Sequence, residues 1–242
     1  MTMKITVVLL TWKRISTLKK TLLSLSNQTY KNFNVHISNG NLQHSQVVDK
    51  SARYFSDRLK ITVSHDGNDL HAFRRFPVCN MLAKGGTDVV LFIDDDVTFP
   101  NTYVENAIRH YKPKTYQSGF AWRFEKGGKD YYRYRTRLFD NKQKVHYCGT
   151  GVGMIDASIF LEKGLFEAPK EAYLIEDLWL SYFAQKVMKW DLLYFEIPDV
   201  IIGGADSVAL YKQINKYKRT GETSYDKADL LRLLVKKYGW QL

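Results

Sequence analysis

The chain has 242 residues, 45% of them hydrophobic, which is enough to bury the core of one large α/β domain or two small ones and excludes a disordered chain. Lysine and arginine outnumber aspartate and glutamate by 36 to 25, and the net charge of +11 suits nucleic acid, an anionic membrane surface or a phosphorylated substrate as partner. Only two cysteines are present, too few for a disulfide framework, so we expect Cys79 and Cys148 to be reduced, packed thiols in a reducing compartment.

Residues 1–100 alternate between strand-like and helix-like segments. Strands are predicted at Ile5–Thr11, Phe33–Ser38, Lys60–Ser64 and Asp88–Ile93, and helices at Ser16–Ser26 (with Ser16 or Thr17 as N-cap), Gln46–Arg58 and Pro77–Lys84. This alternation predicts a mainly parallel sheet covered by helices, in which ligands bind beyond the carboxyl ends of the strands. The opening run has no signal-peptide cleavage pattern, and no apolar run reaches the ~20 residues that span a membrane.

After Pro100 the character of the sequence changes. Strands are predicted at Tyr116–Phe124, Val145–Ile155 and Leu192–Ile197, and helices at Glu176–Met188 and Lys227–Tyr238. We find neither an internal repeat nor a low-complexity linker, which indicates one compact α/β domain.

Three consecutive aspartates, Asp94, Asp95 and Asp96, end the apolar run Val89–Ile93. Aspartate is a poor strand residue, and adjacent carboxylates repel one another unless a cation neutralises them. Oxygen ligands at the ligand-binding edge of a sheet suit a hard cation, Mg²⁺ or Mn²⁺, that shares its coordination shell with substrate phosphates. The alternative is a solvated loop in which Asp96 is the N-cap of a helix.

Several segments resemble, in order, those of one enzyme class. Phe92–Val97 resembles the Asp-x-Asp signature of GT-A glycosyltransferases, especially the family-2-like class. The opening strand Ile5–Arg14, the segment Leu22–Phe33, the glycine segment Gly149–Ile155 and the Glu-Asp motif Glu176–Trp179 are similar to others of its motifs. The resemblance covers most of the chain. It implies a single GT-A (Rossmann-like) domain, with residues 1–100 as a donor-binding half and residues 101–242 as an acceptor-binding half.

The resemblance also implies roles for the aspartates and their neighbours. Asp96 would be the main protein ligand of Mn²⁺ or Mg²⁺, Asp94 would contact the metal or the donor ribose, and Asp95 would lie against the donor. The guanidinium fork of Arg74 or Arg75 suits the donor's diphosphate, although a pair of arginines in a loop is often only solvated.

A nucleotide pocket is implied at the ends of the first three strands. Thr11 and Arg14 would line it, together with Asn39 and Asp66. Asn39 stands where relatives usually have aspartate, but an amide can still pair with uracil, so a UDP-sugar is the first choice of donor. For Asn39 and Asp66 the alternative is a purely local role in turns.

Asp177 is the predicted catalytic base of an inverting single displacement, with Glu176 supporting its orientation. The alternative is that the two acids only favour the start of a helix electrostatically. Relatives often place a histidine metal ligand after the strand at Leu192–Ile197. This sequence has Ile201–Ser207 there, so Asp206 or a water would take that place.

The segment Tyr131–Arg137 interleaves three tyrosines with three arginines, which suits stacking on sugars or bases and pairing with phosphates. An amphipathic strand with a charged outer face is the alternative. Predicted acceptor contacts are Trp122, Tyr132, Arg133, Arg135 and Trp179, although tryptophan near a helix start is often a core residue. Lys212–Arg219 is a second basic cluster.

The leading hypothesis is a transferase that builds a polysaccharide, a lipid-linked glycan or a protein-linked glycan. We expect it in a bacterial cytoplasm, or as a viral protein in the host cytoplasm, with peripheral contact with anionic surfaces as a further expectation. A second hypothesis, motivated by the net charge, makes a modified base in DNA the acceptor. A third is a catalytically silent nucleic-acid or carbohydrate-binding domain on the same scaffold, against which the two intact acidic motifs argue.

Overall fold

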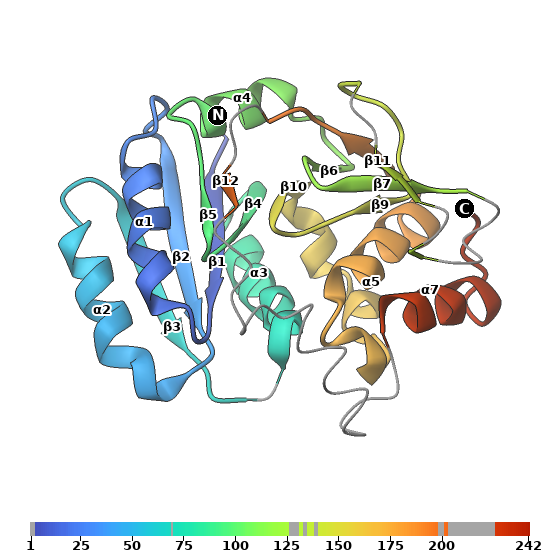
Figure 1. Cartoon of the computed structure of the whole chain (residues 1–242), viewed down its shortest axis with the longest axis horizontal. Helices are drawn as coiled ribbons and strands as arrows, with labels where there is room; N and C mark the ends of the chain where they lie inside the picture. Colours follow the sequence, from blue (N-terminus) through green and yellow to red (C-terminus); the bar gives the residue numbers. More distant parts are fainter. Residues whose placement is uncertain are drawn as a thin grey trace.

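The computed structural model describes residues 3–68, 70–125, 131–132, 135–137, 140–197, 201–202 and 226–242, with the backbone alone for 135–137 and 201–202. A seven-stranded sheet lies at the centre of this described part (Figure 1). From one edge to the other its strands are β3 (Lys60–His65), β2 (Phe33–Asn39), β1 (Ile5–Thr11), β4 (Val89–Asp94), β10 (Val152–Asp156), β6 (Thr115–Ser118) and β11 (Asp191–Tyr194).

The sheet is mainly parallel, as predicted. β1 pairs in parallel with β2 and β4, β2 with β3, and β6 with β11, whereas β10 runs antiparallel to both β4 and β6. The register places Thr11 opposite Asn39 and Leu10 opposite Asp94, so the carboxyl ends of β1, β2 and β4 meet at one edge. Because β10 is antiparallel, its first residue, Val152, pairs with Ile93 at that same edge.

Alternation along the buried strands creates two cores, one on each face of the sheet. Val7 and Leu9 pack with the helices of one face, and Val8 packs with those of the other. The first face carries α1 (Ile15–Ser26), α2 (Ser45–Tyr54) and α4 (Tyr103–His110); the second carries α3 (Arg75–Lys84), α5 (Glu176–Tyr182) and α7 (Lys227–Lys236). α5 contacts α7, and the two lie side by side in the half of the molecule away from α2 (Figure 1).

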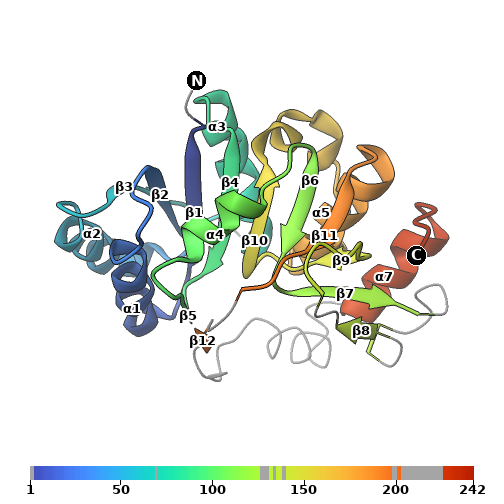
Figure 2. The same ribbon diagram turned by 90° about the horizontal axis from the view of Figure 1, so that it is seen from above.

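Two small sheets extend this framework. β5 (Val97–Thr98) pairs with β12 (Ile201–Ile202), which brings the later segment beside the strand that follows the three aspartates. In the other small sheet, β7 (Ala121–Phe124) lies between β8 (Arg135–Arg137) and β9 (Tyr147–Cys148). Figure 2 shows this sheet in the half of the molecule that also holds α5 and α7.

Two predicted strands are each divided in the structure. The segment Tyr116–Phe124 forms β6 and β7, in different sheets, because the chain bends at Gly119, where a Cβ would lie only 2.7 Å from the side chain of Ile197. Likewise, Val145–Ile155 forms β9 and β10, separated by residues 149–151. In the segment Tyr131–Arg137, for which an amphipathic strand is the alternative interpretation, residues 135–137 are described as strand.

The predicted helices are present with different ends. Pro77 is tolerated in the first turn of a helix, so it does not mark the start of α3, which begins at Arg75 after a 3₁₀ turn, His71–Arg74. α2 ends at Tyr54, and α5 continues as a π-helical turn, Phe183–Val187. The predicted N-caps of α1 are wrong: the helix begins at Ile15, and the Thr17 hydroxyl donates to the Arg14 carbonyl at 2.8 Å.

Both cysteines are buried and free, as predicted. Among the helices in the described ranges, none combines the length and the apolar character needed to cross a membrane.

Candidate active site

The three aspartates lie at the carboxyl edge of the sheet, where β4 ends at Asp94. The side chains of Asp94 and Asp96 are 35% and 12% exposed, whereas that of Asp95 is only 3% exposed. Successive side chains point to opposite sides as the backbone leaves the strand, so Asp95 is turned into the interior. The structure therefore presents Asp94 and Asp96, separated by one residue, toward the outside.

Arg14, the residue before α1, neutralises two of these carboxylates. Its Nη2 lies 2.8 Å from Asp95 Oδ1, and its Nη1 donates to Asp96 Oδ2. Burial raises the pKa of the Asp95 carboxyl to about 7, an effect that the charge of Arg14 opposes. Arg14 thus supplies the positive charge that lets Asp95 and Asp96 stand next to each other.

Arg75 joins the aspartate cluster to the Glu-Asp motif. Its guanidinium donates from Nη2 to Asp94 Oδ1 at 2.6 Å and from Nε to Glu176 Oε1 at 2.9 Å. Arg75 is 4% exposed, and among the described residues its Nη1 has no hydrogen-bond partner. Burial raises the pKa of Glu176 to about 7, with Arg75 opposing the shift, and the Thr150 hydroxyl also donates to Glu176 Oε1 at 3.1 Å. One buried side chain therefore connects carboxylates that are far apart in the sequence.

Asp177, next to Glu176 in the first turn of α5, has donors of its own. Its Oδ2 accepts from the Tyr147 hydroxyl and from Lys227 Nζ, the latter at 3.0 Å. Its Oδ1 accepts from the backbone N–H of Leu178 at 2.9 Å. The side chain is 13% exposed, so the carboxylate remains partly open to solvent.

The predicted nucleotide pocket lies at the ends of β1, β2 and β3. Asn39 is fully buried: its Nδ2 donates to the Asn41 carbonyl at 2.8 Å, and its Oδ1 accepts from the Asn41 N–H at 3.0 Å. Asp66 accepts from the Asn68 N–H at 2.8 Å and is partly exposed. Both side chains thus make the turn contacts of the alternative interpretation, while Thr11 is buried beside them at the end of β1.

Arg74 crosses the end of β2 instead of lying in a solvated loop. A Cβ on Gly40 would come within 1.5 Å of its Nη1, so the guanidinium rests directly on the glycine backbone. Its Nε donates to the His71 carbonyl at 2.9 Å. This arrangement closes one side of the edge at which Asn39 and Asp66 lie.

The predicted acceptor residues are spread over the second half. Trp122 on β7 is partly exposed, and its ring stacks on Tyr147 with centroids 5.1 Å apart. Trp179 is 3% exposed and donates from Nε1 to the Leu165 carbonyl at 2.8 Å, so it is a core residue, as the alternative interpretation has it. Tyr132 is 53% exposed, and its ring lies edge-on to that of Tyr131, with centroids 5.0 Å apart.

Some predicted residues cannot be placed. Arg133, Asp206 and the cluster Lys212–Arg219 lie outside the described residues, and Arg135 is described by its backbone alone, in β8 opposite Phe124.

Asp94 and Asp96 fit a hard cation that is completed by other ligands. In the described part of the chain, no three acidic, histidine or cysteine side chains converge as a metal would need. A Cβ on Gly151 would lie 2.7 Å from Asp94 Oδ2, so this glycine keeps a space open beside the carboxylate. Mg²⁺ and similar ions are often held by one or two carboxylates plus substrate phosphates and water, which is what these two side chains provide.

Sequence reasoning missed three residues of the site. Tyr147, Thr150 and Lys227 all touch the Glu-Asp motif, yet each is a common residue type in an ordinary context. Lys227 is 50 positions from Asp177 and opens an amphipathic helix, where lysine is expected on the exposed side. Thr150 lies in the predicted glycine segment, between Gly149 and Gly151, but nothing in the sequence indicated that its hydroxyl would contact Glu176.

The family model for glycosyl transferase family 2 matches residues 6–167, which is more than half of the chain. The chain belongs to glycosyl transferase family 2. The resemblance seen in the sequence is thereby confirmed. The match ends before Glu176 and Asp177, so their roles rest on the geometry above.

Solved structures show that this chain has the GT-A fold. The structure of S. aureus TarS 1–349 in complex with UDP is 17% identical, with a TM-score of 0.56 over 80% of this chain and 58% of that one. Mannosyltransferase PcManGT from Pyrobaculum calidifontis, in complex with GDP-Man and Mn²⁺, is 13% identical, with a TM-score of 0.57 over 94% and 66%. GalNAc-T7 with UDP, GalNAc and Mn²⁺ is 12% identical, with a TM-score of 0.57 over 89% and 48%.

The present chain therefore spans less than two thirds of the length of each of these three proteins. At such identities the likeness extends to the fold alone. No curated protein matches the sequence.

Proposed function

We propose that this protein is a metal-dependent, inverting glycosyltransferase, which moves a sugar from a nucleoside diphosphate donor to a hydroxyl of a glycan, lipid-linked or protein-linked acceptor. A UDP-sugar is the first donor to test. The expected location is the cytoplasm, with peripheral contact with anionic surfaces.

One observation carries the proposal: the contact of Arg75 with both Asp94 and Glu176. Through it, the carboxylates proposed for the donor and the acid next to the proposed base belong to a single site. A transferase needs both sets together, because the acceptor oxygen must attack the sugar carbon while the diphosphate leaves. A binding domain without catalysis has no need to hold both.

The proposed donor side consists of Asp94 and Asp96, with Arg75 behind them. Asp96 and Asp94 would hold Mn²⁺ or Mg²⁺, which when bound offsets the negative charge that gathers on the diphosphate. Within the described part of the chain Arg75 Nη1 has no hydrogen-bond partner, and this donor would be available to a phosphate oxygen. Thr11, Arg14, Asn39, Asp66 and Asp95 shape the nucleotide pocket, directly or by holding its loops.

The proposed acceptor side consists of Asp177 with Glu176 beside it, and Trp122 and Tyr132 farther out. The acceptor hydroxyl forms a bond to the anomeric carbon from the face opposite the diphosphate, the bond from that carbon to the diphosphate oxygen breaks, and Asp177 takes the hydroxyl proton. A proton transfer of this kind typically contributes ~10²–10⁴ in rate. Arg133 and Arg135 complete the proposed acceptor residues, whereas Trp179 is excluded because it is buried in the core.

A DNA acceptor is the second candidate, because the net charge of +11 favours a polyanion. It predicts that the protein is retained on double-stranded DNA, and that retention falls steeply as salt is raised. A neutral glycan acceptor predicts no such dependence.

The proposal is tested by the release of nucleoside diphosphate from UDP- and GDP-linked sugars, with Mn²⁺ or with a chelator. The wild-type protein should release product from at least one donor, and the chelator should stop the release. Asp177→Asn keeps the shape of the side chain but cannot accept a proton at neutral pH, so turnover should fall by roughly 10²–10⁴. Full turnover by Asp177→Asn, or in chelator, would contradict the proposal.

A further inference from the structure

Lys227 is a charged residue of the site that no acidic or glycine motif marks. It is the first residue of α7, and its ammonium group donates to Asp177 Oδ2 at 3.0 Å and to the Tyr147 hydroxyl at 2.7 Å. Tyr147 in turn donates its hydroxyl proton to the same Asp177 oxygen. Two donors, one from β9 and one from α7, thus converge on a single carboxylate oxygen of α5.

The ammonium group is held by more than its hydrogen bonds. It lies 5.2 Å from the centroid of the Tyr147 ring and 5.8 Å from that of Tyr131, distances at which an aromatic face attracts a cation. The Tyr147 ring is itself fixed by its stack with Trp122, with centroids 5.1 Å apart. Lys227 therefore has little freedom to point elsewhere.

The start of α7, at Lys227, is also held in place by a helix cap and by buried leucines. Asp226 caps the helix by accepting from the N–H groups of Ala228 and Asp229, and Asp229 returns a contact to the Asp226 N–H at 3.0 Å. Leu230, Leu231 and Leu234 are fully buried. At the other end of the helix, Trp240 Nε1 donates to Gln185 Oε1 at 2.6 Å.

Stability alone is a weak reason for this arrangement. An ion pair in the interior gains little over a packed apolar pair, because both charges must leave water. The Lys227 side chain is 22% exposed and that of Asp177 is 13% exposed, so the pair lies at the border between core and solvent. With Oδ2 taken by two donors, the carboxylate can turn little about its bond to the rest of the side chain.

We propose that Lys227 is a positioning residue, which together with Tyr147 holds the Asp177 carboxylate in the orientation in which it accepts the acceptor's proton. This inference rests on the proposed function, because it assigns Lys227 to the base of that reaction. It predicts that loss of the ammonium group lowers turnover and leaves nucleotide binding unchanged, since Asp94 and Asp96 lie on the other side of Arg75.

The test compares Lys227→Ala with Lys236→Ala, an exposed lysine of the same helix, using nucleoside diphosphate release and calorimetric binding of UDP with Mn²⁺. Lys227→Ala should lower kcat by roughly 10- to 100-fold with unchanged UDP affinity, as a misplaced catalytic group does. Lys236→Ala should match wild type. Lys227→Arg should recover part of the loss.

Ethylammonium ions added to the Lys227→Ala protein can replace the missing ammonium group of the lysine side chain. They should raise its kcat several-fold, with no effect on wild type or on Lys236→Ala, and a role limited to packing α7 would not be rescued in this way. Wild-type turnover with an unaffected Lys227→Ala, or a loss that neither Lys227→Arg nor ethylammonium relieves, would overturn this inference alone. Absence of turnover in the wild-type protein would overturn the proposed function, and this inference with it.

Discussion

Arg75 is a buried cation that stabilises two carboxylates at once. It is 4% exposed and contacts Asp94 and Glu176, neither of which is near it in the sequence. The same guanidinium opposes the effect of burial on the pKa of Glu176. The carboxylates of this site are therefore neutralised by two arginines even without a metal. Arg75 pairs with Asp94 and Glu176, and Arg14 pairs with Asp95 and Asp96.

Replacing this cation should cost stability as well as activity. We expect Arg75→Met to lower the free energy of unfolding by roughly 3–5 kcal/mol, because a buried carboxylate is left without its partner. Adding Glu176→Gln should recover part of that loss by removing one of the unpaired charges. Urea denaturation measures both effects.

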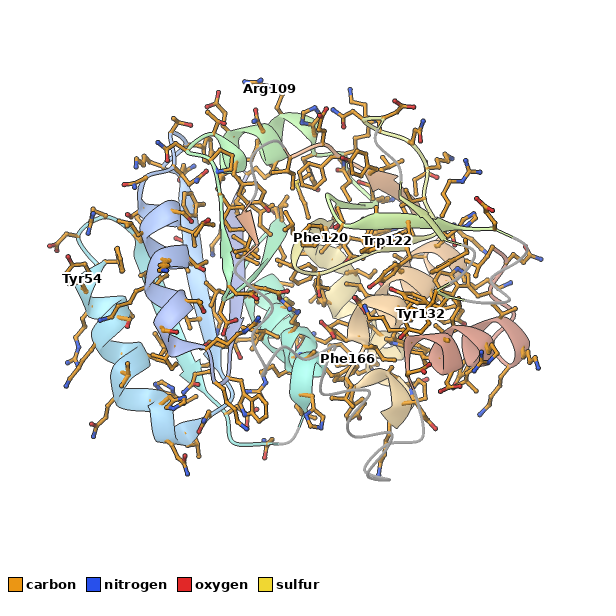
Figure 3. The ribbon with its side chains drawn as sticks, in the orientation of Figure 1. Tyr54, Arg109, Phe120, Trp122, Tyr132 and Phe166 are labelled. Carbon is orange, nitrogen blue, oxygen red and sulfur yellow. The ribbon has the colours of Figure 1, made fainter. Side chains whose placement is uncertain are left out.

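The matched control is Arg109→Met, on α4 at the periphery of the molecule (Figure 3). The Arg109 side chain is 65% exposed, and its pair with Glu105 should contribute no more than ~1 kcal/mol. Equal stability of the Arg75 and Arg109 variants would show that the bridge does not hold the fold.

His36 predicts a dependence of stability on pH that is separate from the site. It is 2% exposed, between the hydroxyls of Thr62 and Ser64, and burial lowers its pKa from 6.5 to about 4. Between these two values the unfolded chain binds a proton that the folded chain does not. The contribution of neutral His36 to the free energy of unfolding should therefore be fully present above about pH 6.5. As the pH falls toward 4, the free energy of unfolding should decrease by up to ~3 kcal/mol.

Denaturant unfolding of wild type and His36→Gln across that range isolates the effect, because the other titrating groups are common to both proteins. The variant should lose less stability than wild type on acidification. Parallel pH profiles for the two proteins would contradict the assignment to His36.

The connection from β9 to β10 is the element that shapes the space beside Asp94. Because β10 is antiparallel to β4, the glycines before it arrive at the carboxyl edge. A Cβ on Gly151 would meet Asp94 Oδ2 at 2.7 Å and the Phe120 ring at 3.2 Å. A side chain there would push the carboxylate or the ring away.

We expect Gly151→Ala to lower the rate of transfer by roughly 10²-fold, the effect of displacing a catalytic group by about an ångström, with only a small change in melting temperature. Gly164→Ala is the control, because its nearest neighbour, the Phe183 ring, lies at an ordinary contact distance of 3.4 Å. Rates measured with the best donor decide the question. A Gly151→Ala protein as active as the control would mean that the space beside Asp94 is not used.

Elements with a strong local pattern could be predicted from the sequence, and breaks in the chain path could not. The apolar runs of β1 and β4 predicted buried parallel strands, and the leucines of α1 and α7 predicted amphipathic helices. In contrast, the division of Tyr116–Phe124 into two strands depends on the contacts of β6 with β10 and β11 and on those of β7 with β8 and β9. Such contacts join residues that are distant in the sequence, and no local pattern encodes them.

The same limit explains which site residues were foreseen. Asp94, Asp96, Glu176 and Asp177 stand in short acidic motifs, and the family resemblance pointed to them. Lys227 owes its position to the packing of α7 against α5, which brings a distant residue onto Asp177. The contacts of Arg75 became visible only when the two halves of the chain were placed on one sheet.

At the scale of the whole molecule, the proposed function places a donor half and an acceptor half on either side of the Arg75 guanidinium. Calorimetric titration of UDP, with and without Mn²⁺, into Asp96→Ala and Asp177→Asn tests this division most directly. Mn²⁺ should tighten UDP binding to wild type and to Asp177→Asn, but not to Asp96→Ala. No effect of Mn²⁺ on wild type, or loss of the effect in Asp177→Asn with its retention in Asp96→Ala, would contradict the account.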